Sequence, residues 1–254
     1  MIFVAAGTQD GRELTEALVW RGHSVTASVV SRYGEQLLAA CGNDNLTIHD
    51  EPLDEDGFVA YIRAHAIRAF VDASHPYAVN VSKNAMAACH VTGTPYIRYE
   101  RALSALGYAK IHVVHGYEEA AERAAQLGAH VFLTTGSRNL EKFTQAEALK
   151  PCTLTARVLP TADVVALCER LSLTPGQIVA LQGPFSTALN AELFKKYRAD
   201  VIVTKNSGAI GGTDTKIEAA RELEIPVVLI DRPVLAYDTL ARTYEEVIRF
   251  VEEN

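Results

Sequence analysis

The chain has 254 residues, 48% of them hydrophobic, which is enough for one large or two small domains with a real core. Its formal net charge of −7 argues against a general nucleic-acid binder, although basic residues can still cluster locally. No apolar stretch approaches the roughly 18 uncharged residues of a membrane span, so we expect no membrane partner.

The cysteines are widely spaced and form no CxxC pair, which is typical of reduced thiols in a cytoplasmic protein. Met1 leads directly into an apolar segment at residues 2–4, without a charged region before it. This pattern predicts that there is no signal peptide.

The first predicted unit is a strand at residues 2–6, a turn containing Gly7, Thr8 and Gly11, and a helix at residues 12–21. It is similar to the first turn of a dinucleotide-binding fold, although the middle glycine of GxGxxG is missing. A second strand is expected at residues 24–30. Arg32 follows it, and either binds a 2′-phosphate of NADP or is a solvated side chain at a helix start.

The loop after the predicted strand at residues 69–71 contains several side chains that could bind a ligand or transfer a proton. Asp72, Ser74, His75 and Tyr77 offer a carboxylate, a hydroxyl, an imidazole and a phenol within six residues. Ligands bind at the carboxyl ends of parallel strands, which favours a functional interpretation. The alternative is that Asp72 and Ser74 cap the next helix, at residues 78–92, and that His75 packs in the core.

Strands and helices alternate along the rest of the chain. Further strands are expected at residues 46–49, 96–98, 110–114, 130–133, 153–158, 178–181, 201–203 and 227–230, and further helices at 55–65, 118–127, 162–171, 187–197 and 244–252. This alternation predicts an α/β protein with two Rossmann-like, doubly wound parallel sheets. We expect one domain at residues 1–105 and a second at residues 106–254.

The stretch at residues 204–221 has a strand before it, a glycine-rich turn and a helix start. Thr215 and Glu218 have the spacing of a capping box, and Lys205 and Lys216 flank the turn. Such a layout directs backbone N–H groups toward an anion, although the glycines are also consistent with a simple tight turn. The stretch matches neither the P-loop nor GxGxxG.

Several common chemistries are not supported by the residues. None of the ten tyrosines has a lysine four residues later, as a short-chain reductase needs. There is no HExxH or GxSxG motif. His112 and His115 are three residues apart, but on a strand they would face opposite sides, and the other histidines have no metal-ligand spacing, so we expect no metal.

Taken in order, the polar loops resemble one family, the precorrin-6A and cobalt-precorrin-6A reductases of cobalamin biosynthesis. The motifs that carry the resemblance are at residues 7–8, 72–78, 98–101, 134–136, 157–160, 183–186, 204–208, 216–220 and 232–233. Ser74, Ala102 and Ala209 depart from the family, which often has Thr, Pro and Gly there.

The resemblance implies two α/β domains with the ligands between them. It implies hydride transfer from NADPH or NADH to the macrocycle of precorrin-6A, or of its cobalt complex, giving the 6B form. The substrate is a polycarboxylate, so an acidic protein needs local positive charge to bind it, and charge-assisted hydrogen bonds suit that task. The candidate substrate-binding residues are Ser74, Arg98, Arg101, Arg138, Ser186, Lys205, Lys216 and Arg232.

Three loops compete for the cofactor's pyrophosphate. They contain Gly7 and Thr8, Gly136 and Ser137, and Asn206, Ser207 and Gly208. The proton donor is His75, Tyr77 or water. A different NAD(P)-dependent Rossmann reductase and a non-catalytic tetrapyrrole- or nucleotide-binding module stay open as alternatives. The sequence also leaves open a monomer or a weak homo-oligomer.

Overall fold

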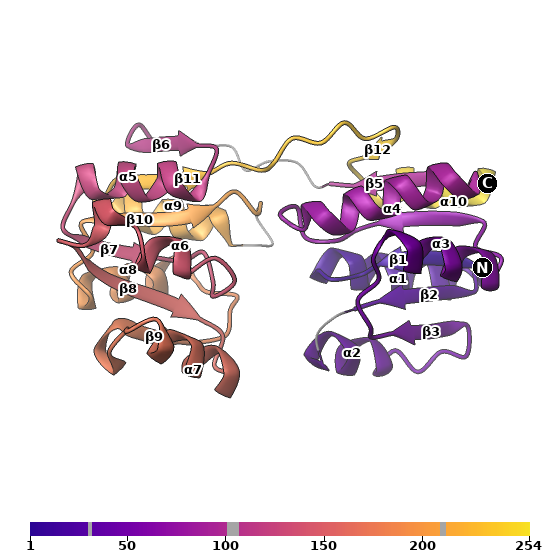
Figure 1. Ribbon diagram of the computed structural model, residues 1–254, viewed down its shortest axis with the longest axis horizontal. Coiled ribbons are helices and arrows are strands. Elements are labelled where there is room, and N and C mark those ends of the chain that lie inside the picture. The colour runs from indigo at the N-terminus through magenta and orange to yellow at the C-terminus, as the bar shows by residue number, and fades with distance from the viewer. Residues whose placement is uncertain (30–31, 101–106, 209–211) are drawn as a thin grey trace. The chain divides into compact units, whose positions relative to one another are not determined.

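The computed structural model describes residues 1–29, 32–100, 107–208 and 212–254. It divides into two compact units (Figure 1). Unit 1 is Met1–Ala102 with Pro233–Asn254, and unit 2 is Leu103–Arg232. This division differs from the expected domains at the C-terminal end, because the last segment of the chain belongs with the first unit.

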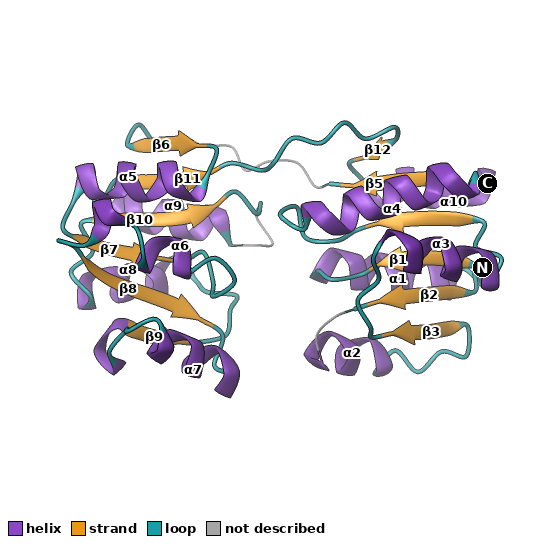
Figure 2. Cartoon of the chain, viewed as in Figure 1, coloured by secondary structure: helices purple, strands orange, loops and turns teal. Residues whose placement is uncertain are grey.

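Unit 1 contains one parallel sheet with helices on both faces (Figure 2). Its strands are β1 (Ile2–Ala5), β2 (Val25–Ser28), β3 (Leu46–His49), β4 (Ala69–Asp72), β5 (Tyr96–Tyr99) and β12 (Leu240–Ala241). Their order is β12-β5-β4-β1-β2-β3. Its helices are α1 (Gln9–Trp20), α2 (Arg32–Ala39), α3 (Glu55–Ala64), α4 (Val79–Thr92) and α10 (Tyr244–Glu253).

The alternation of side chains along β1 explains the two layers of helices. Val4 packs with Leu14 of α1 and Val251 of α10 on one face of the sheet. Phe3 packs with Phe58 of α3 on the other face, in the cluster that α4 also joins. All four residues of β1 are buried, as expected for a central strand of a parallel sheet.

Unit 2 repeats this architecture. Its strands are β6 (Ile111–Val114), β7 (His130–Leu133), β8 (Thr153–Val158), β9 (Ile178–Ala180), β10 (Val201–Lys205) and β11 (Val227–Ile230). Their order is β6-β11-β10-β7-β8-β9. Its α-helices are α5 (Tyr117–Leu127), α6 (Glu141–Thr144), α7 (Ala162–Arg170), α8 (Thr187–Lys196) and α9 (Thr213–Glu222), and 3-10 turns occur at Glu147–Leu149 and Pro175–Gln177.

Both sheets follow the strand order of dinucleotide-binding folds, with one difference in the sixth position. In unit 1 that position is filled by β12, from the end of the chain, which pairs with β5. In unit 2 it is filled by β6, which precedes the other strands of the unit and pairs with β11. The prediction of two doubly wound parallel sheets is confirmed.

Most predicted elements are present within one or two residues at each end. The sequence pattern predicted neither β12, which has only two residues, nor the short helix α6. None of the helices in the described part of the chain is long and apolar enough to cross a membrane.

Candidate active site

The strand order reverses between β1 and β4 in the sheet of unit 1, and between β7 and β10 in the sheet of unit 2. Because β1 pairs with β4 and β7 pairs with β10, the loops that follow each pair lie together at the carboxyl edge of their sheet. Ligands of open parallel sheets bind at such reversal points. The three predicted pyrophosphate loops and the polar loop after β4 all follow these strands.

The turn between β1 and α1 is a capped helix start with open space beside it. Thr8 accepts the Gly11 N–H at 3.0 Å, and its hydroxyl donates to the Ala73 carbonyl at 2.9 Å. A Cβ on Gly11 would lie 2.8 Å from the Ala6 Cα, so this close packing requires glycine. A Cβ on Gly7 would meet no atom within 4 Å, so a ligand has room to approach that backbone.

Asp72, the last residue of β4, is fully buried at the centre of a polar network. It accepts hydrogen bonds from Arg98 Nη1 (2.7 Å), Ser82 Oγ (2.6 Å), Tyr96 OH (2.7 Å) and the Ser74 N–H (3.0 Å). Burial by itself raises the pKa of Asp72, but the Arg98 charge and the hydrogen bonds outweigh it and hold that pKa below its ordinary value. Asp72 is therefore a buried carboxylate anion.

Arg98 was expected to bind substrate, but its side chain is only 1% exposed. Besides Asp72, its guanidinium contacts Ser74 Oγ at 3.1 Å and Glu100 Oε1 at 3.3 Å, and lies 5.5 Å from the centre of the Tyr237 ring. The geometry therefore favours an organising role for Arg98 and Ser74. The helix-capping alternative for Asp72 and Ser74 is wrong, because α4 begins after Ala78 with no side-chain capping bond.

The two candidate proton donors are neighbours in the loop that this network supports. His75 Nδ1 accepts the Tyr77 N–H at 3.3 Å, and the two rings lie 5.6 Å apart. The His75 carbonyl accepts the Ala78 N–H at 2.7 Å. Both side chains are half-buried, so they retain access to a ligand.

In unit 2, the loop after β10 is tied to the chain around it. The Ser207 N–H donates to Thr213 Oγ1 at 3.1 Å, and Thr213 Oγ1 donates to the Lys205 carbonyl at 3.1 Å. Arg232 Nε donates to the Asn206 carbonyl at 2.8 Å. The Ser207 N–H is thus used within the chain.

The start of α9 differs from the predicted capping box. Gly212 is the N-cap, with φ of 69°, and the helix begins at Thr213. Thr215 Oγ1 donates to the Gly212 carbonyl at 3.2 Å, while Glu218 pairs with Arg221 at 2.6 Å. The left-handed conformation at Gly212 explains why the glycine is needed there.

A group of cations, which we call the basic cluster, lies around the carboxyl ends of β7, β8 and β10, with Arg157 within β8 and Lys205 as the last residue of β10. Its members are Arg138, Arg157, Lys205 and Lys216. Burial and then the charge of Arg138 lower the pKa of Lys205 to about 8. Burial, followed by the charges of Arg157 and Lys205, lowers the pKa of Lys216 to about 7. Lys205 and Lys216 are thus poorly solvated cations near other positive charges, of which Arg157 is buried and Arg138 is exposed.

Arg157 was not among the predicted site residues, although it lies in one of the motifs of the family resemblance. Arg157 is 6% exposed and donates from Nη1 to Asn190 Oδ1 at 2.7 Å. The available signal was a single arginine between apolar residues near the end of a predicted strand. Arginine is seldom fully buried in a strand unless it has a partner or a ligand to bind.

The other candidate residues of unit 2 lie in loops or at helix starts. Gly136 has φ of 77°, and Arg138 is exposed. The helix after Ser137, α6, has only four residues. Ser186 is the N-cap of α8 and accepts the Leu189 N–H at 3.2 Å.

Ala102, which departs from the family pattern, lies outside the described residues, and three candidate or departing positions besides it are not described in full. Arg101 and Ala209 lie outside the described residues. Arg32 begins α2, but its side chain is outside the description too.

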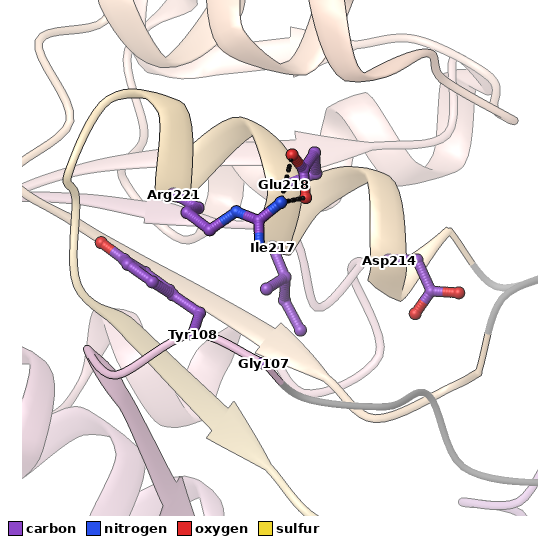
Figure 3. Close-up of a pocket in the computed structure, with 6 residues that line it drawn as sticks. All are labelled: Gly107, Tyr108, Asp214, Ile217, Glu218 and Arg221. Carbon is purple, nitrogen blue, oxygen red and sulfur yellow. Dashed lines mark hydrogen bonds and ion pairs between the residues drawn. The ribbon is translucent and has the colours of Figure 1, made fainter.

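A pocket of about 250 Å³ lies in unit 2 between α9 and the segment before β6 (Figure 3). It is lined by Gly107, Tyr108, Asp214, Ile217, Glu218 and Arg221. Glu218 accepts both of its contacts from Arg221 Nη2, as the dashed lines in Figure 3 show, which leaves the Asp214 carboxylate as the remaining charge. This pocket is therefore poorly suited to a phosphate or a polycarboxylate.

Comparisons with known proteins agree with this geometry. The family model described as Precorrin-6x reductase CbiJ/CobK matches residues 1–252. A cobalt-precorrin-6A reductase of Priestia megaterium is 41% identical over 251 residues, covering 98% of this chain and 96% of that protein. One from Salmonella typhimurium is 37% identical over 234 residues, covering 91% and 87%.

The solved structure of a CobK precorrin-6A reductase has a TM-score of 0.80 with 26% identity, and the match covers 99% of this chain and 96% of that one. The motifs, the two sheets and these likenesses span nearly the whole chain. The chain belongs to the precorrin-6x reductase family of cobalamin biosynthesis.

Proposed function

We propose that this chain is an NADPH- or NADH-dependent reductase that converts precorrin-6A, or cobalt-precorrin-6A, to the 6B form. The observation that carries the proposal is the basic cluster at the carboxyl edge of the sheet of unit 2, in a protein of net charge −7. A tetrapyrrole with many carboxylates is the kind of ligand that such a cluster attracts.

The turn between β1 and α1 is the best supported place for the cofactor's pyrophosphate. It offers a capped twelve-residue helix at the reversal point and open space beside Gly7. The Gly136 loop is followed by a helix of four residues, which supplies little dipole. In the Asn206 loop, the Ser207 N–H is already bonded to Thr213.

The cofactor supplies the hydride, so the chain's own residues bind, orient and protonate. Asp72 and Arg98 hold the loop that carries His75 and Tyr77. With Nδ1 accepting the Tyr77 N–H, a neutral His75 ring carries its proton on Nε2, which is the atom that would donate. Reduction of a double bond to CH–CH needs one hydride and one proton, and His75 or Tyr77 supplies the proton at one carbon.

The free, widely spaced cysteines are consistent with the cytoplasm as the compartment of this reductase. We keep the choice between NADPH and NADH, and between the metal-free and the cobalt-bearing substrate, as outcomes of the assay.

The test is anaerobic incubation of the protein with precorrin-6A, with or without cobalt, and with NADPH or NADH. Oxidation of the nicotinamide together with a changed corrinoid spectrum is expected. Tight binding of the macrocycle without turnover would instead favour a non-catalytic binding module. Turnover of an unrelated carbonyl substrate alone would favour another type of reductase.

A further inference from the structure

Arg157 occupies an unusual place for a cation. It lies in β8 between Ala156 and Val158, both of which are buried, and is itself only 6% exposed. Its neighbour across the sheet in the register of β9 is Val179. A guanidinium in such surroundings loses most of its hydration, and burial accordingly lowers the pKa of Arg157 to about 10.

Asn190, on α8, fixes the direction of the guanidinium. The Asn190 side chain is fully buried, and its Nδ2 donates to the Ser186 carbonyl at 3.0 Å and to Thr215 Oγ1 at 3.3 Å. These two acceptors determine which end of the amide is nitrogen, so Oδ1 faces Arg157 and accepts from Nη1 at 2.7 Å. The amide thus holds one edge of the guanidinium.

Phe185 covers the face of the same group. The Arg157 Cζ lies 4.2 Å from the centre of the Phe185 ring. Gly183 makes room for that ring, because a Cβ there would lie 3.0 Å from Phe185 Cε2. With its face covered and one edge held, the guanidinium presents its other N–H donors in a fixed plane.

Among the described residues, no ion pair balances the charge of Arg157. No carboxylate among the described residues forms an ion pair with it, and its one side-chain hydrogen-bond acceptor, Asn190, is neutral. Lys216 is close enough for Arg157 to lower its pKa. A buried cation beside another cation is unfavourable for the ligand-free fold, which points to an anion that binds here.

We propose that Arg157 is a substrate-binding residue that takes one carboxylate of the tetrapyrrole in a two-pronged contact, with Asn190 and Phe185 as positioning residues. The inference rests on the proposed function and adds a carboxylate subsite to it. A fixed guanidinium plane matches the planar carboxylate group. The same chemistry would accept a cofactor phosphate, so the experiment must separate the two sources.

The first arm of the experiment measures binding and turnover in Arg157→Met, Arg157→Lys and the matched control Arg170→Met, whose arginine is exposed on α7 of the same unit. Arg157→Met should weaken binding of precorrin-6A, and raise its KM, by about 10- to 100-fold, with a smaller change in kcat. Arg157→Lys should recover only part of this loss, because an ammonium group cannot donate two parallel hydrogen bonds to one carboxylate. Arg170→Met should match the wild type.

The second arm compares NADPH with NADH. Unchanged Kd values for both cofactors in Arg157→Met support the carboxylate subsite. A selective loss of NADPH affinity would assign Arg157 to the 2′-phosphate and overturn the proposal.

The third arm measures the thermal midpoint without ligands. If Arg157 is kept for binding, Arg157→Met should unfold at the same or a higher temperature than the wild type, because methionine removes a buried charge. A lower midpoint together with an unchanged tetrapyrrole Kd would make Arg157 a structural residue. Wild-type protein that neither binds nor reduces precorrin-6A would instead refute the proposed function, and the subsite with it.

Discussion

Arg98 Nη1 donates to Asp72 Oδ1 over 2.7 Å, and neither side chain is more than 1% exposed. This pair joins the end of β4 to β5 and, through the contacts of Arg98 with Tyr237, to the segment that returns to unit 1. The loop with His75 and Tyr77 begins directly after Asp72. A single buried ion pair therefore supports both the fold of unit 1 and the place of its candidate proton donors.

Removing one partner of this pair should be severely destabilising. Arg98→Met leaves the Asp72 carboxylate buried and uncompensated, which costs about 3–5 kcal/mol of the free energy of unfolding. Urea denaturation measures the loss, and Arg63→Met, at an exposed position in the last turn of α3, is the control. A loss below about 1 kcal/mol in Arg98→Met would contradict this assignment.

The same pair predicts how stability depends on pH. The pKa of Asp72 is held below its ordinary value of 3.8, so its stabilisation is present above that pH and is lost as the pH falls through the lowered value. In Arg98→Met only burial and the hydrogen bonds remain, and the pKa of Asp72 should rise. The difference in unfolding free energy between the two proteins should therefore shrink on acidification from neutral pH. A constant difference would show that Arg98 does not lower the pKa of Asp72.

Alanine substitutions at two glycines of one turn should differ in their effect on stability. Gly11→Ala places a Cβ 2.8 Å from Ala6 Cα and should lower stability by about 1–3 kcal/mol. Gly7→Ala meets no protein atom and should leave stability within about 0.5 kcal/mol of the wild type. If the pyrophosphate binds here, Gly7→Ala should nevertheless weaken NADPH binding, as calorimetry would detect. Unchanged affinity in Gly7→Ala would move the pyrophosphate to another loop.

Lys216 should make substrate affinity depend on pH. Its pKa is lowered from 10.5 to about 7, so in the ligand-free protein it loses its charge as the pH rises through that value. Binding of the tetrapyrrole should weaken over this range, and the Lys216→Met variant should lose this part of the dependence. Lys205 has a pKa lowered to about 8, so it should contribute the part of this pH dependence of binding that occurs at higher pH.

The sign for stability is the reverse of that for binding. Between pH 7 and 10.5 the unfolded chain binds a proton at Lys216 that the folded chain does not, so unfolding free energy rises with pH there. Lys150→Met is the control, since that lysine is 64% exposed. A pH dependence of binding that is identical in Lys216→Met and wild type would contradict a role for Lys216.

The proton donor can be identified by kinetics. Loss of the donor should lower kcat by about 10²- to 10⁴-fold without changing NADPH affinity. His75→Ala and Tyr77→Phe should be compared in single-turnover assays. If both variants keep the kcat and KM of the wild type, water supplies the proton.

The sequence predicted the sheets well because their strands are short, apolar and separated by strong helix patterns. It missed β12, since two residues carry no periodicity, and so it assigned the C-terminal segment to the wrong unit. The sequence drew attention to the polar loop at Asp72 and to Arg98, but spacing along the chain does not show that residues 26 apart form a buried pair. Arg157 gave only a weak signal, because its burial depends on α8 and on Phe185.

The central claim is that a hydride passes from a nicotinamide cofactor to the corrinoid macrocycle. The direct measurement is mass spectrometry of the product formed anaerobically with NADPH or NADH deuterated at the transferred position. One deuterium per 6B macrocycle is the predicted result. A 6B product without deuterium, or a deuterated cofactor left unconsumed beside intact precorrin-6A and cobalt-precorrin-6A, would contradict the claim.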